Sequence, residues 1–374
     1  MNVLVVTVVH TPLDARIYHR QIRSLRDADI SVTYAAPWSA TATPRPSATE
    51  LLTVDLPRAQ GRRRLAALLA ARQLLRREGH RYDVILLHDP ELLLAVVGQL
   101  RRLPTIVHDV HEDTATALID RPWLPGPLRG LAAWTIHRLE RWAEDRVHLL
   151  LAERSYQDRF GRHHPFVPNV PPPPDDEPPP PGDRRVVYLG RIARSRGALE
   201  ILAVAADLHE EVTFELIGPA DPDVEPMVAA SVAAGHLRWH GFVPNAAALP
   251  LVDGALVGLS LVHPQPNHAG SLQTKVLEYL SRRVPVISSD LPVTGAFVRD
   301  NGVGLVVPAE DPDAVAAAIR HLRAHPAERR AMAERGYTLT RDELNWDIAG
   351  AAFVATIRAL ASSTGSGGNG DRGS

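Results

Sequence analysis

The stretch GSLQTKVLEYLSRRVPVI at residues 270–287 is the segment from which the fold of the whole chain can be predicted. An apolar run at 255–262 precedes it and indicates a buried strand, and the polar loop HPQPNHAGS joins the two. Apolar residues then recur at helical spacing, and Pro285 opens a further buried strand. A strand, loop, helix and strand in this order place the N-terminus of a helix at one edge of a parallel sheet.

Four polar residues crowd the start of the predicted helix: Ser271, Gln273, Thr274 and Lys275. Free backbone N–H groups and the helix dipole make such a helix start an anion site. Glu278 follows about one turn later, where its carboxylate can accept hydrogen bonds from two neighbouring hydroxyls, such as a ribose diol. An anion site and a diol site one turn apart describe a nucleoside diphosphate. The alternative is an ordinary crossover whose glutamate is solvated.

A second anion site is predicted in the segment YLGRIARSRGALE, residues 188–200. Gly190 follows an apolar strand and lets another chain or a ligand approach the backbone closely. Arg191 and Arg196 then carry two cations to the carboxyl edge of the sheet, where they can neutralise a diphosphate without a metal. The alternative is a pair of solvated surface arginines.

Composition limits the class of protein. The chain has 374 residues, enough for two domains, and its 45% hydrophobic and 22% charged residues are typical of a soluble globular protein. A formal net charge of −2 gives no indication of a nucleic-acid partner. There are no cysteines, which excludes disulfides, thiolate metal sites and cysteine nucleophiles and fits the cytoplasm. Abundant Ala, Arg and Pro indicate a bacterial source.

The N-terminal run MNVLVVTVV is interpreted as a first buried strand and not as a signal peptide, because it has no basic leader and no cleavage site. No run reaches the roughly 18 apolar residues that a membrane span needs. Strands that alternate with helical patterns predict a parallel doubly wound domain at residues 1–168. Its strands are expected at 2–9, 30–36, 51–56, 84–87, 105–110 and 148–152, with a helix at 14–26.

The rest of the chain is expected to repeat this α/β organisation. Residues 169–183 contain eight prolines between Pro171 and Pro181 and are predicted to be an interdomain linker, the alternative being a ligand for a proline-binding domain. A second doubly wound domain follows at 184–343, with further strands at 185–189, 212–217, 237–240 and 304–307. A long apolar helix is expected at 344–361 and a disordered, low-complexity tail at 362–374.

Titratable residues gather at the predicted strand ends of the first domain, where doubly wound sheets bind ligands. They are His10, Asp14 and Arg16 after the first strand, His88 and Asp89 after the fourth, and Asp109, His111 and Glu112 after the fifth. Asp14 is either part of this site or simply the N-cap of its helix. A metal site is the alternative interpretation, but no H-E-x-x-H spacing occurs and the strand-end histidines are expected on opposite faces, so we predict none.

The basic helix expected at 62–81 carries arginines beside an Ala/Leu face. Such a helix either lies on an anionic membrane or packs one face on the core and leaves its charges in solvent. The segment RPWLPGPLRGLAAW at 121–134 is a second candidate for membrane contact. Together they allow a lipid-linked substrate without requiring one.

Several of these motifs resemble the retaining glycosyltransferases of GT-B fold, the family 4-like or group 1 transferases of bacterial polysaccharide synthesis. The pattern P-T-K-x-x-E-Y is matched from Gln273 to Tyr279, and Pro285 and Val286 fit its continuation. The pattern G-R-hydrophobic-x-x-x-K-G is matched from Gly190 to Gly197, with Arg196 in place of its lysine. The family often has a second Glu eight positions before Glu278, and here that position is Gly270. The segments VHDVHED and HTPLDARIYHRQ look like the D-x-H-E and D-x-R segments of the same subgroup.

The resemblance implies two Rossmann-like domains facing a cleft, a final helix that crosses back to the first domain, and transfer of a sugar from a UDP- or GDP-linked donor with retention of configuration. It implies that Arg191, Arg196 and His111 act in catalysis. Donor contacts are implied for Glu278, Thr274, Lys275, Ser271, Gly270 and Gly190, and for Gly218, Phe242 and Val243 at the nucleobase. The acceptor side would comprise His10, Asp14, Arg16, His88, Asp89, Asp109 and Glu112.

The same resemblance implies no cofactor and no metal. The partners would be the nucleoside diphosphate sugar and an acceptor, which is a glycan, a lipid-linked saccharide or a small molecule. The setting would be the cytoplasm or the inner face of the plasma membrane. Two other functions stay open: a nucleotide-sugar epimerase of the same fold, and a non-catalytic homologue that binds the nucleotide sugar. A dehydrogenase is disfavoured, because no G-x-G-x-x-G follows the first strand.

Overall fold

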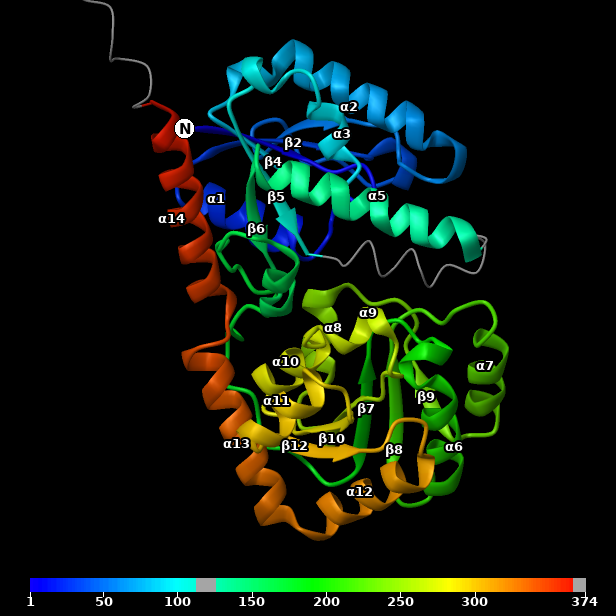
Figure 1. Cartoon of the computed structure of the whole chain (residues 1–374). Helices are drawn as coiled ribbons and strands as arrows, with labels where there is room; N and C mark the ends of the chain where they lie inside the picture. The colour runs from blue at the N-terminus through cyan, green and yellow to red at the C-terminus, as the bar shows by residue number, and fades with distance from the viewer. Residues whose placement is uncertain (112–125, 366–374) are drawn as a thin grey trace, which may run out of the picture. The chain divides into compact units, whose positions relative to one another are not determined.

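A computed structural model describes residues 1–111 and 126–365 of the chain. The chain forms two compact units (Figure 1). Unit 1 comprises Met1–Asn169 together with Ile348–Ser374, and unit 2 comprises Val170–Asp347. Each unit contains a six-stranded parallel sheet, so the predicted fold class of two doubly wound α/β domains is confirmed.

The sheet of unit 1 has the strand order β3-β2-β1-β4-β5-β6. Its strands are β1(Asn2–Val6), β2(Ser31–Ala36), β3(Leu52–Asp55), β4(Val84–Leu87), β5(Thr105–Val110) and β6(His148–Leu151). Central strands are apolar on both faces, since each face of a doubly wound sheet is covered by helices. The order changes direction between β1 and β4, and ligands of such sheets bind at the carboxyl ends of those strands.

Helices join these strands in chain order. They are η1(Ile17–Ile22), α1(Arg23–Asp27), η2(Ser39–Thr41), η3(Gly61–Arg63), α2(Arg64–Glu78), η4(Gly79–Arg81), α3(Leu92–Val96), η5(Leu100–Arg102), α5(Gly126–Glu144) and η6(Arg154–Arg159). The basic helix α2 buries Ala67, Ala71 and Leu75 in the core with α3. One face of α2 therefore packs on the core, as one of its two interpretations predicts, while Leu65 and Leu69 on the same helix stay exposed.

Unit 2 repeats the topology with the strand order β12-β11-β10-β7-β8-β9. Its strands are β7(Arg185–Leu189), β8(Thr213–Ile217), β9(Leu237–Trp239), β10(Val257–Ser260), β11(Val286–Ser289) and β12(Gly304–Val307). Its helices are η7(Arg194–Arg196), α6(Ala198–Leu208), α7(Glu225–Ala233), α8(Asn245–Leu251), α9(Pro266–Ala269), α10(Thr274–Ser281), α11(Thr294–Asn301), α12(Pro312–Ala324) and α13(Pro326–Asp342). Here the order changes direction between β7 and β10.

Two predicted boundaries are wrong for a local reason. The first strand ends at Val6 and not at Val9, because the backbone N–H groups of Val8 and Val9 donate to Asp89 Oδ2 at 2.5 and 3.2 Å. The helix expected at 14–26 begins as the π-helical turn η1, which the Gln21 N–H closes by donating to the Arg16 carbonyl at 2.9 Å. Turns of this kind are frequent at functional sites.

The last helix, α14(Trp346–Gly365), packs on unit 1 (Figure 1). Phe353 and Ile357 are fully buried, and the Arg358 guanidinium donates to the Ala28 carbonyl at 2.8 Å. Residues 362–365, which the sequence predicts to be part of the disordered tail, continue the helix, and Ser362 Oγ donates to the Arg358 carbonyl one turn back at 3.0 Å. Residues 366–374 lie outside the described part of the chain.

The proline-rich segment groups with unit 2 from Val170 onward. Arg283 pairs with Glu177 at 2.7 Å and donates to the Pro178 carbonyl at 3.2 Å. The Gly182 N–H donates to the Gly254 carbonyl at 3.0 Å. Much of the segment expected to be a spacer is therefore fixed along the second unit.

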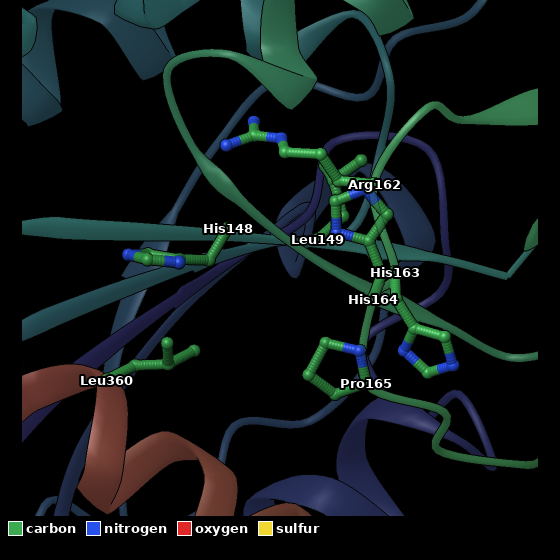
Figure 2. Close-up of a pocket in the computed structure, with 7 residues that line it drawn as sticks. All are labelled: His148, Leu149, Arg162, His163, His164, Pro165 and Leu360. Atoms are coloured by element: carbon green, nitrogen blue, oxygen red, sulfur yellow. The ribbon is translucent and has the colours of Figure 1, made fainter.

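A cavity of about 180 Å³ lies where α14 meets β6 (Figure 2). Leu360 of α14, His148 of β6 and the segment Arg162–Pro165 line it. The first backbone N–H of that segment and the His164 imidazole both bond Glu144, at 2.7 and 3.1 Å. These polar groups thus tie the segment to α5. Among the described helices, none has the length and apolar character required to span a bilayer.

We predict that Phe353→Ala lowers the stability of unit 1 by about 3–5 kcal/mol, because it leaves a cavity where α14 is docked. The matched control is Ile348→Ala on the same helix, whose side chain is 49% exposed and should cost under about 1 kcal/mol. Chemical unfolding of both variants measures the difference. Equal losses would contradict the docking of α14.

Candidate functional site

Three strand ends of unit 2 meet through their backbones. The Gly190 N–H donates to the Ile217 carbonyl at 2.8 Å, and the Gly218 N–H donates to the Gly241 carbonyl at 2.8 Å. Gly218 has φ +144°, and a Cβ placed on it would lie 2.1 Å from the Gly190 carbonyl oxygen. Only glycine fits there, so the edge predicted for the nucleobase is built from closely packed backbone.

Lys275 lies beneath the first of these turns. Its side chain points from α10 toward Gly190, where an added Cβ would lie 3.7 Å from the ammonium nitrogen. The ammonium lies 3.8 Å from the centre of the Tyr188 ring, and among the described residues no group accepts a hydrogen bond from it. Burial, together with the nearby charge of Arg196, lowers the pKa of Lys275 well below its ordinary value, although Glu278 opposes the shift. The sequence did not indicate this burial.

The two predicted arginines differ in their surroundings. Arg191 forms a two-point pair with Asp221, Nε to Oδ1 at 2.5 Å and Nη2 to Oδ2 at 2.9 Å, and its side chain is 64% exposed. Arg196 ends the short turn η7, and no group of the described residues bonds its guanidinium. Asp221 was missed by sequence reasoning, since it follows a strand 30 residues further along the chain.

Glu278 is more deeply buried than expected for a solvated carboxylate. Its relative exposure is 7%, and Asn245 at the start of α8 donates to its Oε1 at 2.8 Å. Within the described part of the chain no donor reaches Oε2. The carboxylate is thus held in position by one amide, with its second oxygen available to a ligand hydroxyl. Asn245 was also missed, as nothing in its spacing marks it.

The remaining donor-side residues surround the start of α10. Thr294 Oγ donates to the Ser271 carbonyl at 3.0 Å and accepts from the Gln273 N–H at 3.2 Å, which fixes the loop ahead of Thr274. Gly270 ends the short helix α9, which the sequence had indicated as loop. Phe242 and Val243 follow Gly241, and the Phe242 ring is 75% exposed.

In unit 1, a buried ion pair organises the acceptor-side residues. Arg16 donates Nε and Nη2 to the two oxygens of Asp109 at 2.7 Å each, and Gln21 donates to Oδ2 at 3.0 Å. Burial acts to raise the pKa of Asp109, but the charge and hydrogen bonds of Arg16 outweigh it and hold the pKa well below its ordinary value. Gln21 was missed by sequence reasoning, because it joins the pair only through the π-helical turn.

Asp89 holds the loop after β1. Its Oδ2 accepts from Thr7 Oγ at 3.0 Å and from the N–H groups of Val8 and Val9. Its Oδ1 lies 3.4 Å from His10 Nε2, yet no described group makes a hydrogen bond to it. Asp89 is 1% exposed, so this oxygen is a buried acceptor that a ligand could satisfy.

Two imidazoles face each other at this strand edge. His111 Nε2 lies 3.1 Å from His10 Nε2, and His111 Nδ1 lies 3.0 Å from the Asp109 carbonyl. That carbonyl requires a hydrogen on Nδ1, so the hydrogen between the rings belongs to His10 when both are neutral. His88 packs against His111 and is fully buried, which lowers its pKa.

Asp14 lies between the start of the helical turn and His10. Its Oδ1 accepts from the N–H groups of Arg16 and Ile17 at 2.8 and 3.0 Å, which caps the helical turn, while its Oδ2 lies 3.8 Å from His10 Nδ1. Burial acts to raise the pKa of Asp14, but His10 and the amide hydrogen bonds lower it. The structure thus brings together seven of the eight titratable residues predicted at these strand ends, and Glu112 lies outside the described residues.

His88, Asp109 and His111 bring potential metal-ligand atoms within 4.8 Å of one another. His111 follows β5, and His88 follows the neighbouring strand β4. His108, also on β5, turns away to the Leu87 carbonyl, and burial lowers its pKa to about 4. A metal here would share Asp109 with the Arg16 guanidinium, a repulsive arrangement, so we do not assign one.

Part of the chain is similar to a known family and to characterised proteins. Residues 183–325 match the family described as Glycosyl transferases group 1. Alpha-D-kanosaminyltransferase from Streptomyces kanamyceticus is 28% identical over 185 residues, 47% of this chain and 45% of that protein. Phosphatidyl-myo-inositol mannosyltransferase from Mycobacterium tuberculosis is 30% identical over 141 residues, 36% of each chain. The chain therefore spans half or less of the curated relatives it matches.

Solved structures match along nearly the whole chain. Sucrose-phosphate synthase from Thermosynechococcus elongatus superimposes with a TM-score of 0.72 at 18% identity, covering 97% of this chain and 99% of that one. HepE of Anabaena in complex with UDP gives a TM-score of 0.68 at 13% identity, covering 96% and 99%. The fold is thus GT-B, as predicted, and the match to the family described as Glycosyl transferases group 1 falls within unit 2.

We predict that Asp109→Asn destabilises unit 1 by about 3–5 kcal/mol, because Arg16 is left as a buried cation without its partner. Asp27→Asn is the matched control, since Asp27 pairs with Arg23 in solvent and should cost under about 1 kcal/mol. Unfolding measured against pH gives a second check.

Because the folded protein has a lowered Asp109 pKa, the ion pair stabilises the fold at pH values above the ordinary carboxyl pKa of 3.8. This stabilisation is lost as the pH falls through the lower pKa of the folded state. The stability difference between wild type and Asp109→Asn should therefore stay constant above about pH 5 and shrink in acid. A difference that grows in acid would contradict the assignment.

Proposed function

We propose that this chain is a glycosyltransferase that moves a sugar from a nucleoside diphosphate sugar, UDP- or GDP-linked, to an acceptor hydroxyl with retention of configuration. Unit 2 would bind the donor and unit 1 the acceptor. The reaction would belong to the synthesis of a bacterial cell-surface polysaccharide, glycoconjugate or natural product in the cytoplasm. The relatives named kanosaminyltransferase and phosphatidyl-myo-inositol mannosyltransferase support this range.

One observation carries the proposal: the buried ammonium of Lys275 has no hydrogen-bond partner within the described residues. A buried amino group without a hydrogen-bond partner is costly, and its pKa falls because nothing stabilises its charged form. Arg196 places a second cation nearby, and their mutual repulsion contributes to the lowered pKa of Lys275. A diphosphate at this strand edge would supply the missing acceptors for both cations.

The other donor-side groups fit the rest of a nucleotide. Glu278 keeps one carboxylate oxygen for a ribose diol, and the exposed Phe242 ring offers a face to a base. Arg191 uses two of its five N–H donors on Asp221, which leaves three for a phosphate. No metal is needed in this arrangement, since the cations are supplied by side chains.

In the reaction that we propose, the bond between the sugar and the diphosphate breaks, and negative charge grows on the leaving oxygen. Lys275, Arg196 and the start of α10 stabilise that charge. The acceptor hydroxyl attacks the face from which the leaving group departs, which retains the configuration. The proton of that hydroxyl goes to the leaving diphosphate, and His111 is the catalytic residue that we propose for unit 1.

We predict that UDP or GDP raises the melting temperature of the wild type and that Arg196→Ala weakens this binding about ten- to hundredfold, as expected for loss of a charge-assisted hydrogen bond. Arg194→Ala is the matched control, because Arg194 lies in the same turn but pairs with Asp223. Thermal shift with titrated nucleotide measures both variants. Equal effects of the two substitutions would contradict the donor site.

Release of the nucleoside diphosphate then distinguishes the functions. A glycosyltransferase releases UDP or GDP faster when an acceptor is present. An epimerase would change the sugar without an acceptor, and a binding homologue would release no diphosphate with any acceptor.

A further inference from the structure

A large cavity lies within unit 1 and reaches the acceptor-side residues. Its volume is about 680 Å³, in the range of pockets that enclose a drug-sized molecule. It extends from the ends of β1, β4 and β5 to α3 and α5. The nucleotide sugar that we propose for unit 2 does not explain this cavity, because the cavity lies within unit 1.

One end of this cavity is polar. His10, His111 and Asp89 line it, and Asp89 Oδ1 has no hydrogen-bond partner among the described groups. A ligand hydroxyl at this end can donate to Asp89 Oδ1, which lies 3.4 Å from His10 Nε2. The polar end thus matches the reacting end of an acceptor.

The remaining walls are mainly apolar. The side chains that form them are Leu94 and Val97 at α3 and Ile136, Leu139 and Trp142 on α5. Leu94 and Val97 are 46% and 41% exposed, so apolar surface at the cavity is left uncovered by the residues that the structure describes. A ligand that covers it would gain about 25 cal/mol for each Å² removed from water.

The charged residues of the cavity are largely paired within the protein. Arg64 pairs with Glu91 at 2.9 Å, and Arg138 lies over the Trp134 ring at 5.5 Å. Glu140 accepts from Arg159 and lies 3.3 Å from His137. The cavity therefore offers little to a phosphate or to a strongly hydrated sugar chain beyond its polar end.

We propose that the acceptor carries its reactive hydroxyl on, or directly beside, an apolar group that fills the space between α3 and α5. This inference rests on the proposed function, because it names the acceptor class of the same transferase. The apolar group comes from one of two sources, a compact ring system or an acyl chain, and both share the chemistry that the walls recognise.

The test measures binding of n-alkyl β-D-glucosides from methyl to dodecyl by calorimetry, below their micelle-forming concentrations and without any donor. Each added methylene should strengthen binding about fourfold while the cavity is being filled. A compact-ring source predicts that the gain ends by octyl and that naphthyl β-D-glucoside binds as well as octyl. An acyl-chain source predicts that the gain continues to dodecyl.

Leu94→Ser should reduce the ratio of octyl to methyl affinity about tenfold, as expected for loss of a leucine contact. Leu69→Ser is the matched control, because Leu69 is also exposed but lies on α2 outside the cavity. Melting curves of both variants verify folding. Equal affinity for methyl and octyl, no binding by the longer glucosides, or equal effects of the two substitutions would overturn the inference.

These measurements use no nucleotide, so they remain informative if the donor site fails its own test. A protein that binds UDP or GDP normally but shows no dependence on alkyl length would refute the acceptor class and leave the transferase proposal standing.

Discussion

Parallel pairing at the point where strand order changes direction is the constraint on which both units depend. β7 pairs with β8 on one side and β10 on the other, so the segments that follow β7 and β10 leave the sheet to opposite faces. Backbone and side chains can then meet at that edge without a helix covering them. Gly190 follows β7, and Lys275 arrives from the helix after β10 beneath it. Unit 1 repeats this geometry at β1 and β4, where Asp89 holds the loop before His10.

The two edges use charge differently. In unit 1 the central carboxylate, Asp109, is fully paired with Arg16, and the partly exposed groups at this edge include His10 and His111. In unit 2 the central cation, Lys275, is buried without a partner. A charged group with a partner holds its side chain in one position. A buried group without a partner costs free energy, which a bound ligand can recover. This contrast supports placing the anionic donor on unit 2 and a neutral hydroxyl on unit 1.

The fold was largely predictable, because periods of two and of 3.6 residues follow directly from burial of strand and helix faces. The strand-end positions of His10, Asp89, Asp109 and His111 followed from the same argument. The partners of these residues did not. Asp221 reaches Arg191 from a different strand, and Gln21 reaches Asp109 only because η1 is a π-helical turn. Such pairs depend on side-chain direction, which the spacing of residues in one sequence does not fix.

The central claim is that Lys275 exchanges a costly unpaired state for a paired one when a diphosphate binds. Because burial and Arg196 lower the pKa of Lys275 in the free protein, a bound anion should raise it and binding should take up protons. Calorimetric titration of UDP and GDP in buffers of different ionisation enthalpy measures that uptake directly. The account predicts net proton uptake by the wild type and its loss in Lys275→Met, and the same uptake in both proteins would contradict it.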